Sequence, residues 1–166
     1  MSIVFFDLFC KTNSNNPIFG LCDDTPPPEK PAYIDELSPP EWIGIVHNPY
    51  NYNVDFYAID NCIIILKPDG INKESRCDGM LHYDNSLIFV ELKMRGNSGW
   101  LIKARTQLTI TIEKFMDNND ISTYKKVEAY VCNGLRPLAI QGNNIQLEKF
   151  KNETGLNMIA KQEIIL

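Results

Sequence analysis

Two carboxylates and a lysine are placed by their spacing at one end of a predicted β-hairpin. Apolar-rich runs lie on both sides of Asp84 and Asn85, a pair that tolerates positive φ and suits a two-residue turn. With that turn, Asp78 lies directly opposite Glu91, and directly opposed side chains have Cβ atoms roughly 5 Å apart on one face. The alternation of side chains along a strand places Lys93 on the same face, beyond Glu91. These three residues predict a site for a divalent metal ion and an activated water.

The second strand of this hairpin is apolar on both faces at its start. Leu87 and Phe89 share a face with Glu91 and Lys93, and the residues between them are also apolar, as in a strand buried on both sides. Two carboxylates facing each other in such a place would repel, and a bound cation would remove that cost. The pattern leaves an alternative open, in which the strand end reaches water and Glu91 and Lys93 form an ordinary solvated pair.

The spacing of these residues is that of a known nuclease motif. Asp-x(12)-Glu-Leu-Lys, followed by an amphipathic helix, resembles the PD-(D/E)XK nuclease superfamily, which includes type II restriction enzymes, archaeal Holliday-junction resolvases and RecB-type nuclease domains. The resemblance covers roughly residues 59–133. It implies that Asp78 and Glu91 ligate Mg²⁺ or Mn²⁺, that the Leu92 backbone carbonyl is a further ligand, and that Lys93 orients or activates the attacking water. Hard divalent ions prefer such oxygen ligands, and they also bind substrate phosphates.

A helix is predicted from Gly99 to about Met116, and its position after the hairpin supports the resemblance. The predicted core-facing stripe consists of Leu101, Ala104, Leu108, Ile112 and Phe115. Many superfamily members carry Gln-x-x-x-Tyr on this helix, with the glutamine near the metal site. Gln107 fits the first position, whereas Thr111 stands where the tyrosine would be. The resemblance thus implies a site role for Gln107, against the alternative of a polar residue on the helix flank. Lys103 and Arg105 would either contact phosphates or face solvent.

Three further acidic residues are weaker candidates. Pro68-Asp69 reproduces the literal signature of the superfamily, but Asp69 does not oppose the second carboxylate and belongs to a predicted turn, so Asp78 is preferred. Superfamily members often supply another acidic residue from an early helix, and Glu36 or Glu41 could take that place. Glu41 is explained more simply as part of a capping box that begins at Ser38.

Length and composition are those of one globular domain. We expect 166 residues to form a single domain, with an acidic, Pro- and Asn-rich part (1–58), a nuclease-like core (59–133) and a C-terminal extension (134–166). The net charge of −5 argues against a nonspecific nucleic-acid binder. Residues 1–60 carry a net charge of −7, whereas residues 61–166 carry +2, so the nuclease-like part is mildly basic.

Cysteine usage and hydropathy predict a cytoplasmic protein. The five cysteines are scattered without a Cys-x-x-Cys pair, so we expect reduced thiols rather than a zinc site or a disulfide framework. The first residues lack the basic start of a signal peptide, and no apolar run approaches the ~18 residues of a membrane span. No membrane partner is expected.

The remaining patterns complete an α/β fold, with a mixed central β-sheet flanked by helices and a restriction-endonuclease-like core. The expected elements are an irregular or extended segment (10–32), a helical turn (42–46), strands (61–67 and 126–131), a short helix (144–152) and a closing edge strand (162–166).

The predicted function is metal-dependent hydrolysis of phosphodiester bonds in nucleic acid, with DNA favoured over RNA and Mg²⁺ or Mn²⁺ as cofactor. A chain of this length has little room for a recognition domain, so a homodimer or a partner subunit would supply specificity. The alternative is a nuclease fold without catalysis that acts as a binding or regulatory subunit. The acidic charge favours that alternative, and the complete Asp78, Glu91 and Lys93 set argues against it.

Overall fold

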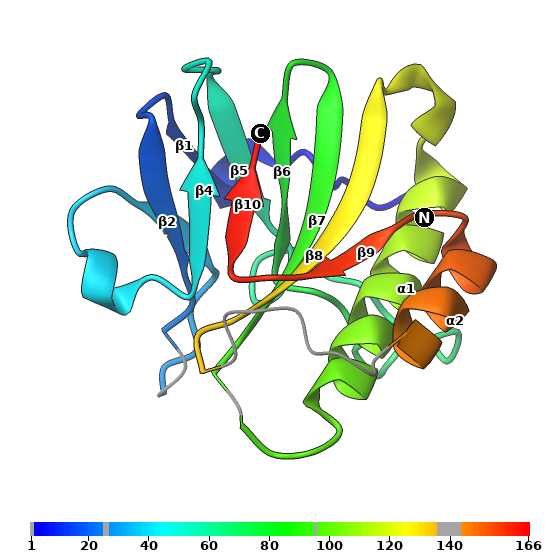
Figure 1. The fold of residues 1–166 in the computed structure, drawn as a ribbon. Coiled ribbons are helices and arrows are strands. Elements are labelled where there is room, and N and C mark those ends of the chain that lie inside the picture. Colours follow the sequence, from blue (N-terminus) through cyan, green and yellow to red (C-terminus); the bar gives the residue numbers. More distant parts are fainter. Residues whose placement is uncertain (1, 25–26, 95, 136–143) are drawn as a thin grey trace.

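The computed structural model describes residues 2–24, 27–94, 96–135 and 144–166, and shows an α/β protein with two mixed sheets and two helices (Figure 1). The larger sheet has six strands in the order β1-β5-β6-β7-β8-β9. Their bounds are β1 (Lys11–Ser14), β5 (Val54–Ala58), β6 (Gly79–Tyr83), β7 (Ser86–Lys93), β8 (Lys126–Asn133) and β9 (Met158–Ala160). The pairs from β1 to β7 are antiparallel, and β7, β8 and β9 are parallel.

The smaller sheet has four strands in the order β10-β4-β2-β3. Their bounds are β2 (Ile18–Cys22), β3 (Tyr33–Asp35), β4 (Gly44–His47) and β10 (Glu163–Ile165). The helices are α1 (Trp100–Asn118) and α2 (Asn144–Thr154), and three short 3₁₀ turns are η1 (Leu8–Cys10), η2 (Pro39–Glu41) and η3 (Ile121–Thr123). Among the described residues, no helix is long and apolar enough to cross a bilayer.

The six-stranded sheet lies between the two helices and the smaller sheet. Leu87 and Phe89 of β7 belong to the core shared with α1 and α2, whereas Ile88 and Val90 belong to the core shared with the smaller sheet. All eight residues of β7 are buried, as predicted for a strand covered on both faces. The prediction of a sheet flanked by helices was therefore wrong for one face, which a second sheet covers.

The predicted hairpin register is confirmed. Gly79 pairs with Val90, and the ladder ends at Tyr83 and Ser86. Asp84 and Asn85 form the turn with φ of 41° and 55°. These left-handed conformations match the right-handed twist of the flanking strands.

The predicted helix after the hairpin is also confirmed as α1, and its whole predicted stripe is buried. Arg105 donates to Gln146 at 2.8 Å and to Glu153 at 2.7 Å, so it ties α1 to α2. The phosphate contact considered for Arg105 is thus replaced by helix packing, whereas Lys103 is exposed.

Predictions from local pattern were less successful before residue 68. The segment 42–46 contains part of strand β4 (Gly44–His47) instead of a helical turn. The segment 10–32 is extended in part, as expected, but this extended chain forms the paired strands β1 and β2. The segment 61–67 is a loop rather than a strand, because the chain turns at Asn61 (φ 60°) and the Ile63 amide bonds back to the Ile59 carbonyl at 3.1 Å. The later predictions hold, since β8, α2 and the edge strand β10 lie at the expected places.

The expectation of reduced thiols was wrong for one pair. Cys10 and Cys62 form a disulfide with their Cα atoms 5.9 Å apart. The antiparallel pairing of Lys11 with Tyr57 brings the start of β1 beside the chain that leaves β5, and spacing along the sequence gives no sign of this proximity. Cys22, Cys77 and Cys132 are free and buried.

We predict that the disulfide contributes to stability through the loop it closes. With a sequence separation of 52, loop-closure entropy suggests that its loss lowers the free energy of unfolding by about 4 kcal/mol. The measurement is urea unfolding of the wild type with and without a thiol reductant. Cys10→Ser/Cys62→Ser should show the same loss and no response to reductant; an unchanged midpoint would contradict the prediction.

We further predict that Gly79→Ala destabilises the protein by about 1–3 kcal/mol, because added atoms in a packed region force backbone shifts. A Cβ at Gly79 would lie 2.7 Å from the Tyr57 carbonyl oxygen and 2.3 Å from Phe56 Cζ. The comparison variant is Gly44→Ala, whose Cβ would meet the side chains of Cys132 at 3.2 Å and Leu92 at 3.4 Å. Urea unfolding should show the larger loss for Gly79→Ala, and equal losses would refute this explanation.

Candidate metal centre

Asp78 and Glu91 lie together where β6 begins. The Asp78 amide donates to Glu91 Oε2 at 3.2 Å, and Asp78 Oδ2 accepts from the Leu92 amide at 2.7 Å. The two carboxyl groups are thus each bonded to the backbone of the opposite strand or its extension. The hairpin places them side by side, as its register predicted.

Lys93 and Gln107 join the same cluster from β7 and α1. Lys93 Nζ lies 3.0 Å from Glu91 Oε1 and donates to Gln107 Oε1 at 2.7 Å. Gln107 Nε2 donates in turn to the Arg76 carbonyl at 3.3 Å. The structure therefore brings all four predicted side chains, Asp78, Glu91, Lys93 and Gln107, into one hydrogen-bonded group.

Thr111 stands where the Gln-x-x-x-Tyr motif has tyrosine, and its hydroxyl joins α1 to the chain that enters β6. Its hydroxyl accepts from the Cys77 amide at 2.7 Å and donates to the Gln107 carbonyl at 2.8 Å. The Cys77 amide is thereby directed away from Leu92, which would be its partner if the ladder continued. Since the amide and carbonyl of one strand residue point to the same side, the Leu92 carbonyl is directed past the end of β6, toward Asp78.

The cluster is buried, which decides between the two readings of the sequence pattern. Asp78 is 6% exposed, Glu91 2% and Lys93 7%. The alternative of a solvated pair at the strand end is therefore wrong.

Burial also shifts the acidity of both carboxyl groups. Desolvation raises the pKa of Glu91 to about 7 even though the Lys93 ammonium acts in the opposite direction. Desolvation and the neighbouring Glu91 charge raise the pKa of Asp78 well above its ordinary value. The ionised pair is thus costly without a further cation.

Two acidic residues near the cluster were missed from sequence. Asp23 follows β2, and its charge contributes to the raised pKa of Asp78. Burial and the charge of Asp60 raise the pKa of Asp23 itself to about 6. Asp60 forms an ion pair of 2.7 Å with Arg76.

The approach of Asp23 is a consequence of sheet packing. Leu21 pairs with Gly44 in the smaller sheet, and Gly44 packs against Leu92 and Cys132 of the larger one. The chain leaving β2 therefore passes over the end of β7. No pattern near Asp23 signals this, because the contact exists only between the two sheets.

The other acidic candidates lie elsewhere or have structural tasks. Glu36 and Glu41 are exposed, and Ser38 makes no side-chain cap bond, so the predicted capping box was wrong. In a capping box the Glu41 side chain would accept from the Ser38 amide. Here Asp35 accepts from that amide at 2.8 Å instead, and also from Trp42 Nε1 at 2.7 Å. Asp69 accepts from two amides of its own exposed turn, in agreement with its assignment as a turn residue.

The donors present suit a hard divalent ion. Within the described parts of the chain, no group of three or more His, Cys, Asp or Glu side chains is arranged to hold a metal. A closed zinc-type site is thus unsupported there. Mg²⁺, by contrast, is commonly held by one or two carboxylates together with waters and substrate phosphates. Asp78, Glu91 and the Leu92 carbonyl fit that donor set.

No protein-family model, curated protein or solved structure matches this chain. The case for a function therefore depends on the geometry of the residues themselves.

We predict that the metal-free protein loses stability as pH rises. The folded pKa of Glu91, about 7, lies above the ordinary 4.5, so the folded state holds the extra proton and its stabilising effect is lost as pH rises through about 7. In EDTA, the melting temperature should fall between about pH 5 and about pH 8, and Mn²⁺ should restore it mainly at the higher pH.

The control for this prediction is Glu91→Gln, which removes the titrating group with little change of volume. Its melting temperature should depend less on pH and respond less to Mn²⁺. A wild-type response to Mn²⁺ that is identical at both pH values, and is retained in Glu91→Gln, would place any metal binding elsewhere.

Proposed function

We propose that this protein is a metal-dependent nuclease that hydrolyses phosphodiester bonds of nucleic acid. The observation that carries the proposal is the buried Asp78–Glu91 pair, joined to Lys93 and Gln107 at one end of the hairpin. The resemblance to the PD-(D/E)XK superfamily adds a restriction-endonuclease-like core to the proposal and favours DNA over RNA.

The arrangement of elements supports a site at this end of the sheet. Strands β5, β6 and β7 form an antiparallel meander, α1 crosses over the sheet, and β8 returns parallel to β7 (Figure 1). The C-terminal end of β7 and the start of α1 consequently lie at the same end of the sheet. Residues from both elements can therefore act on one substrate phosphate.

Each residue has a distinct part in this reaction. Asp78, Glu91 and the Leu92 carbonyl would hold Mg²⁺ or Mn²⁺, and the ion would supply acidification of water and offset negative charge on the phosphate. Lys93, held by Glu91 and Gln107, would orient the attacking water and add positive charge beside the phosphate oxygens. Gln107 positions Lys93 through its carbonyl oxygen.

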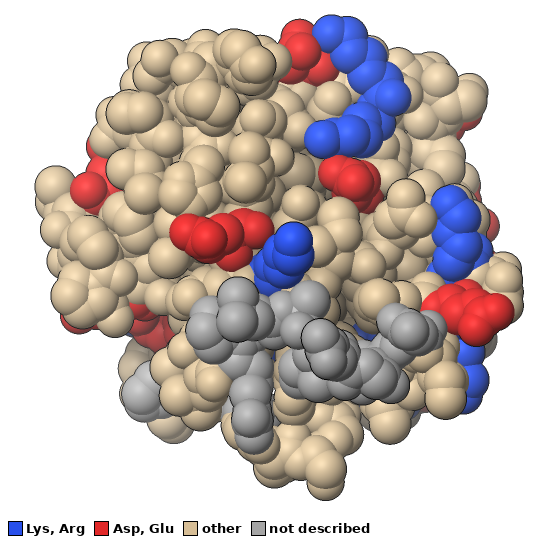
Figure 2. All heavy atoms as spheres, viewed as in Figure 1, with Lys and Arg blue, Asp and Glu red and all other residues tan. Residues whose placement is uncertain are grey.

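Surface charge sets the conditions for substrate binding. The net charge is −5, and on the face drawn in Figure 2 acidic and basic side chains of the described residues are interspersed between wide uncharged areas. A broad basic surface is what usually supports nonspecific binding. Substrate affinity would therefore come from the metal centre and its surroundings, and from a second copy or a partner subunit.

A second candidate is a nuclease fold used for binding without catalysis. It is favoured by the internal bonds of the carboxylates: Asp78 Oδ2 accepts from Leu92, and the two Glu91 oxygens are occupied by Lys93 and the Asp78 amide. Such a group could serve as a buried polar network alone. Mg²⁺ or Mn²⁺ titration distinguishes the candidates, since a binding subunit need show no affinity at Asp78 and Glu91.

The proposal predicts metal-dependent cleavage of nucleic acid. We expect Glu91→Gln and Lys93→Met each to lower the cleavage rate by roughly 10²-fold or more, because each removes a charged group that acts on the reacting phosphate. The assay offers supercoiled plasmid, linear duplex, single strand, four-way junction and RNA with Mn²⁺, Mg²⁺ or EDTA.

The matched control is Lys125→Ala, which removes an exposed lysine that pairs with Asp84 at the hairpin turn, the opposite end of β6 and β7 from the candidate centre. It should cleave at close to the wild-type rate, and circular dichroism should show all three variants folded. Wild-type rates in folded Glu91→Gln would refute the assignment of Glu91. No cleavage of any substrate, together with no metal affinity, would favour the binding candidate.

A further inference from the structure

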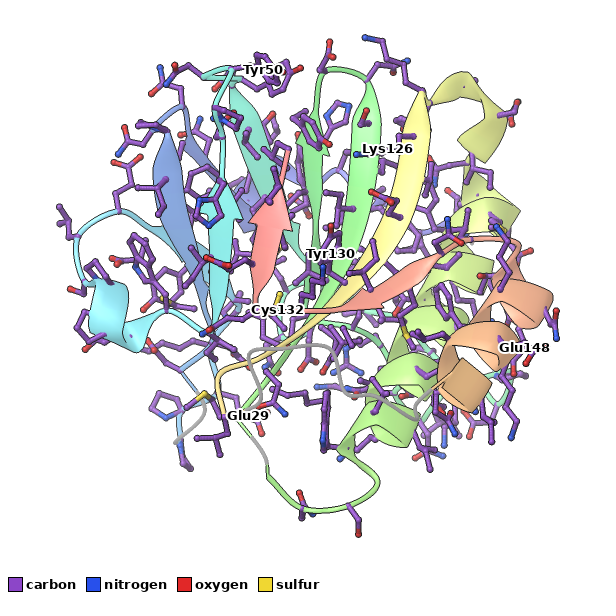
Figure 3. The ribbon with its side chains drawn as sticks, viewed as in Figure 1. Glu29, Tyr50, Lys126, Tyr130, Cys132 and Glu148 are labelled. Carbon is purple, nitrogen blue, oxygen red and sulfur yellow. A yellow bond between two sulfur atoms is a disulfide. The ribbon has the colours of Figure 1, made fainter. Side chains whose placement is uncertain are left out.

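A small cavity lies beside the candidate metal centre. Its volume is about 310 Å³, and its described lining consists of Glu29, Asn61, Cys62, Ile63, Ile64, Ile65, Lys73 and Arg76. Figure 3 shows Glu29 below the lower ends of β6 and β7, the end of the sheet at which α1 begins. The cavity is at the lower end of the size range of ligand pockets, roughly 300–1,000 Å³.

Arg76 connects this cavity to the metal centre. Its carbonyl accepts from Gln107 Nε2 at 3.3 Å, and Gln107 holds Lys93. Its guanidinium pairs with Asp60 at 2.7 Å, and the charge of Asp60 contributes to the raised pKa of both Asp78 and Glu91. A group bound in the cavity would therefore adjoin the phosphate at the metal centre.

Two cationic side chains line the cavity, and they differ in how far their hydrogen bonds are already used. Lys73 is exposed, and among the described residues no carboxylate lies within salt-bridge distance of its ammonium. Arg76 uses one terminal nitrogen on Asp60 and the other on the Glu74 carbonyl at 2.6 Å, while its buried Nε has no hydrogen-bond partner among the described residues. Because this nitrogen is closed off from solvent, a ligand in the cavity does not reach it, and Lys73 is the cation of the described lining that is open to an anion.

The remaining lining is not that of a simple anion site. The wall from Ile63 to Ile65 is apolar, and Asn61 and Glu29 add an amide and a carboxylate. A carboxylate repels a bare phosphate but accepts hydrogen bonds from the exocyclic amino group of a nucleobase. Apolar side chains can pack against the face of the same base.

We propose that this cavity binds one nucleotide of the substrate chain, next to the phosphate that is cut. Lys73 contacts its phosphate, the isoleucine wall packs against its base, and Glu29 and Asn61 bond to the base edge. The biological role of this subsite rests on the proposed nuclease function, whereas the binding of a nucleotide depends on the cavity alone. It deepens that function by making an unpaired nucleotide part of the recognised substrate.

The test measures the affinity of the full chain for deoxyadenosine monophosphate in EDTA, by calorimetry or by NMR. We expect Lys73→Ala to weaken binding roughly tenfold, the effect of losing one charged contact. Lys67→Ala is the matched control, because Lys67 is an exposed lysine of the same turn and does not line the cavity. It should bind as the wild type does.

The affinities for deoxyadenosine alone and for inorganic phosphate alone test the two halves of the nucleotide separately. Tighter binding of the nucleotide than of either fragment supports the proposal, as does a weaker preference for adenine over thymine nucleotides in Glu29→Ala. Equal binding by Lys73→Ala and Lys67→Ala would overturn it, and so would phosphate that binds as tightly as the nucleotide.

The binding assay uses no metal and no cleavage, so its failure is distinct from that of the nuclease proposal. Glu91→Gln should retain nucleotide binding while losing cleavage. If the wild type cuts DNA but Lys73→Ala binds the nucleotide normally, the nuclease stands and the subsite falls. If nothing is cut but Lys73→Ala still loses nucleotide binding, the subsite stands without the nuclease.

Discussion

The burial of two facing carboxylates is the constraint on which the rest of this structure depends. Asp78 and Glu91 are almost fully buried, and water cannot stabilise their charges. The fold compensates in two ways. The backbone amides of Asp78 and Leu92 donate to them, and Lys93 supplies one positive charge within the cluster. One ammonium cannot balance two ionised carboxylates, so the metal-free site retains protons to a higher pH than free carboxyl groups do.

The surrounding elements serve to hold this arrangement in place. The asparagine-containing turn sets the hairpin register, so the opposition of Asp78 and Glu91 is decided some distance from the site. Helix α1 then fixes the other side: Gln107 holds Lys93, and Thr111 diverts the Cys77 amide from the ladder. A hydroxyl is sufficient for that task, and the Thr111 hydroxyl also donates to the Gln107 carbonyl.

Sequence reasoning succeeded where structure is local and failed where it arises between sheets. The hairpin register follows from turn chemistry, so Asp78, Glu91 and Lys93 could be placed together in advance. Apolar periodicity predicted α1, and the resemblance to the nuclease motif added Gln107. The loop at 61–67 reads as an apolar strand, yet a disulfide partner 52 positions away holds it. Asp23 reaches the site only because the smaller sheet packs over the larger one, and a single sequence contains no signal for that contact.

The last two strands have a consequence for how the two layers move. β9 pairs with β8 at the edge of the larger sheet, and β10 pairs with β4 at the edge of the smaller one. Only two residues separate β9 (Met158–Ala160) from β10 (Glu163–Ile165), so this segment joins the edges of both sheets almost without slack. Separation of the layers would have to break one of these pairings. We therefore expect the sheets to exchange their amide hydrogens as one cooperative unit, which would keep Asp23 close enough to influence the Asp78 carboxylate.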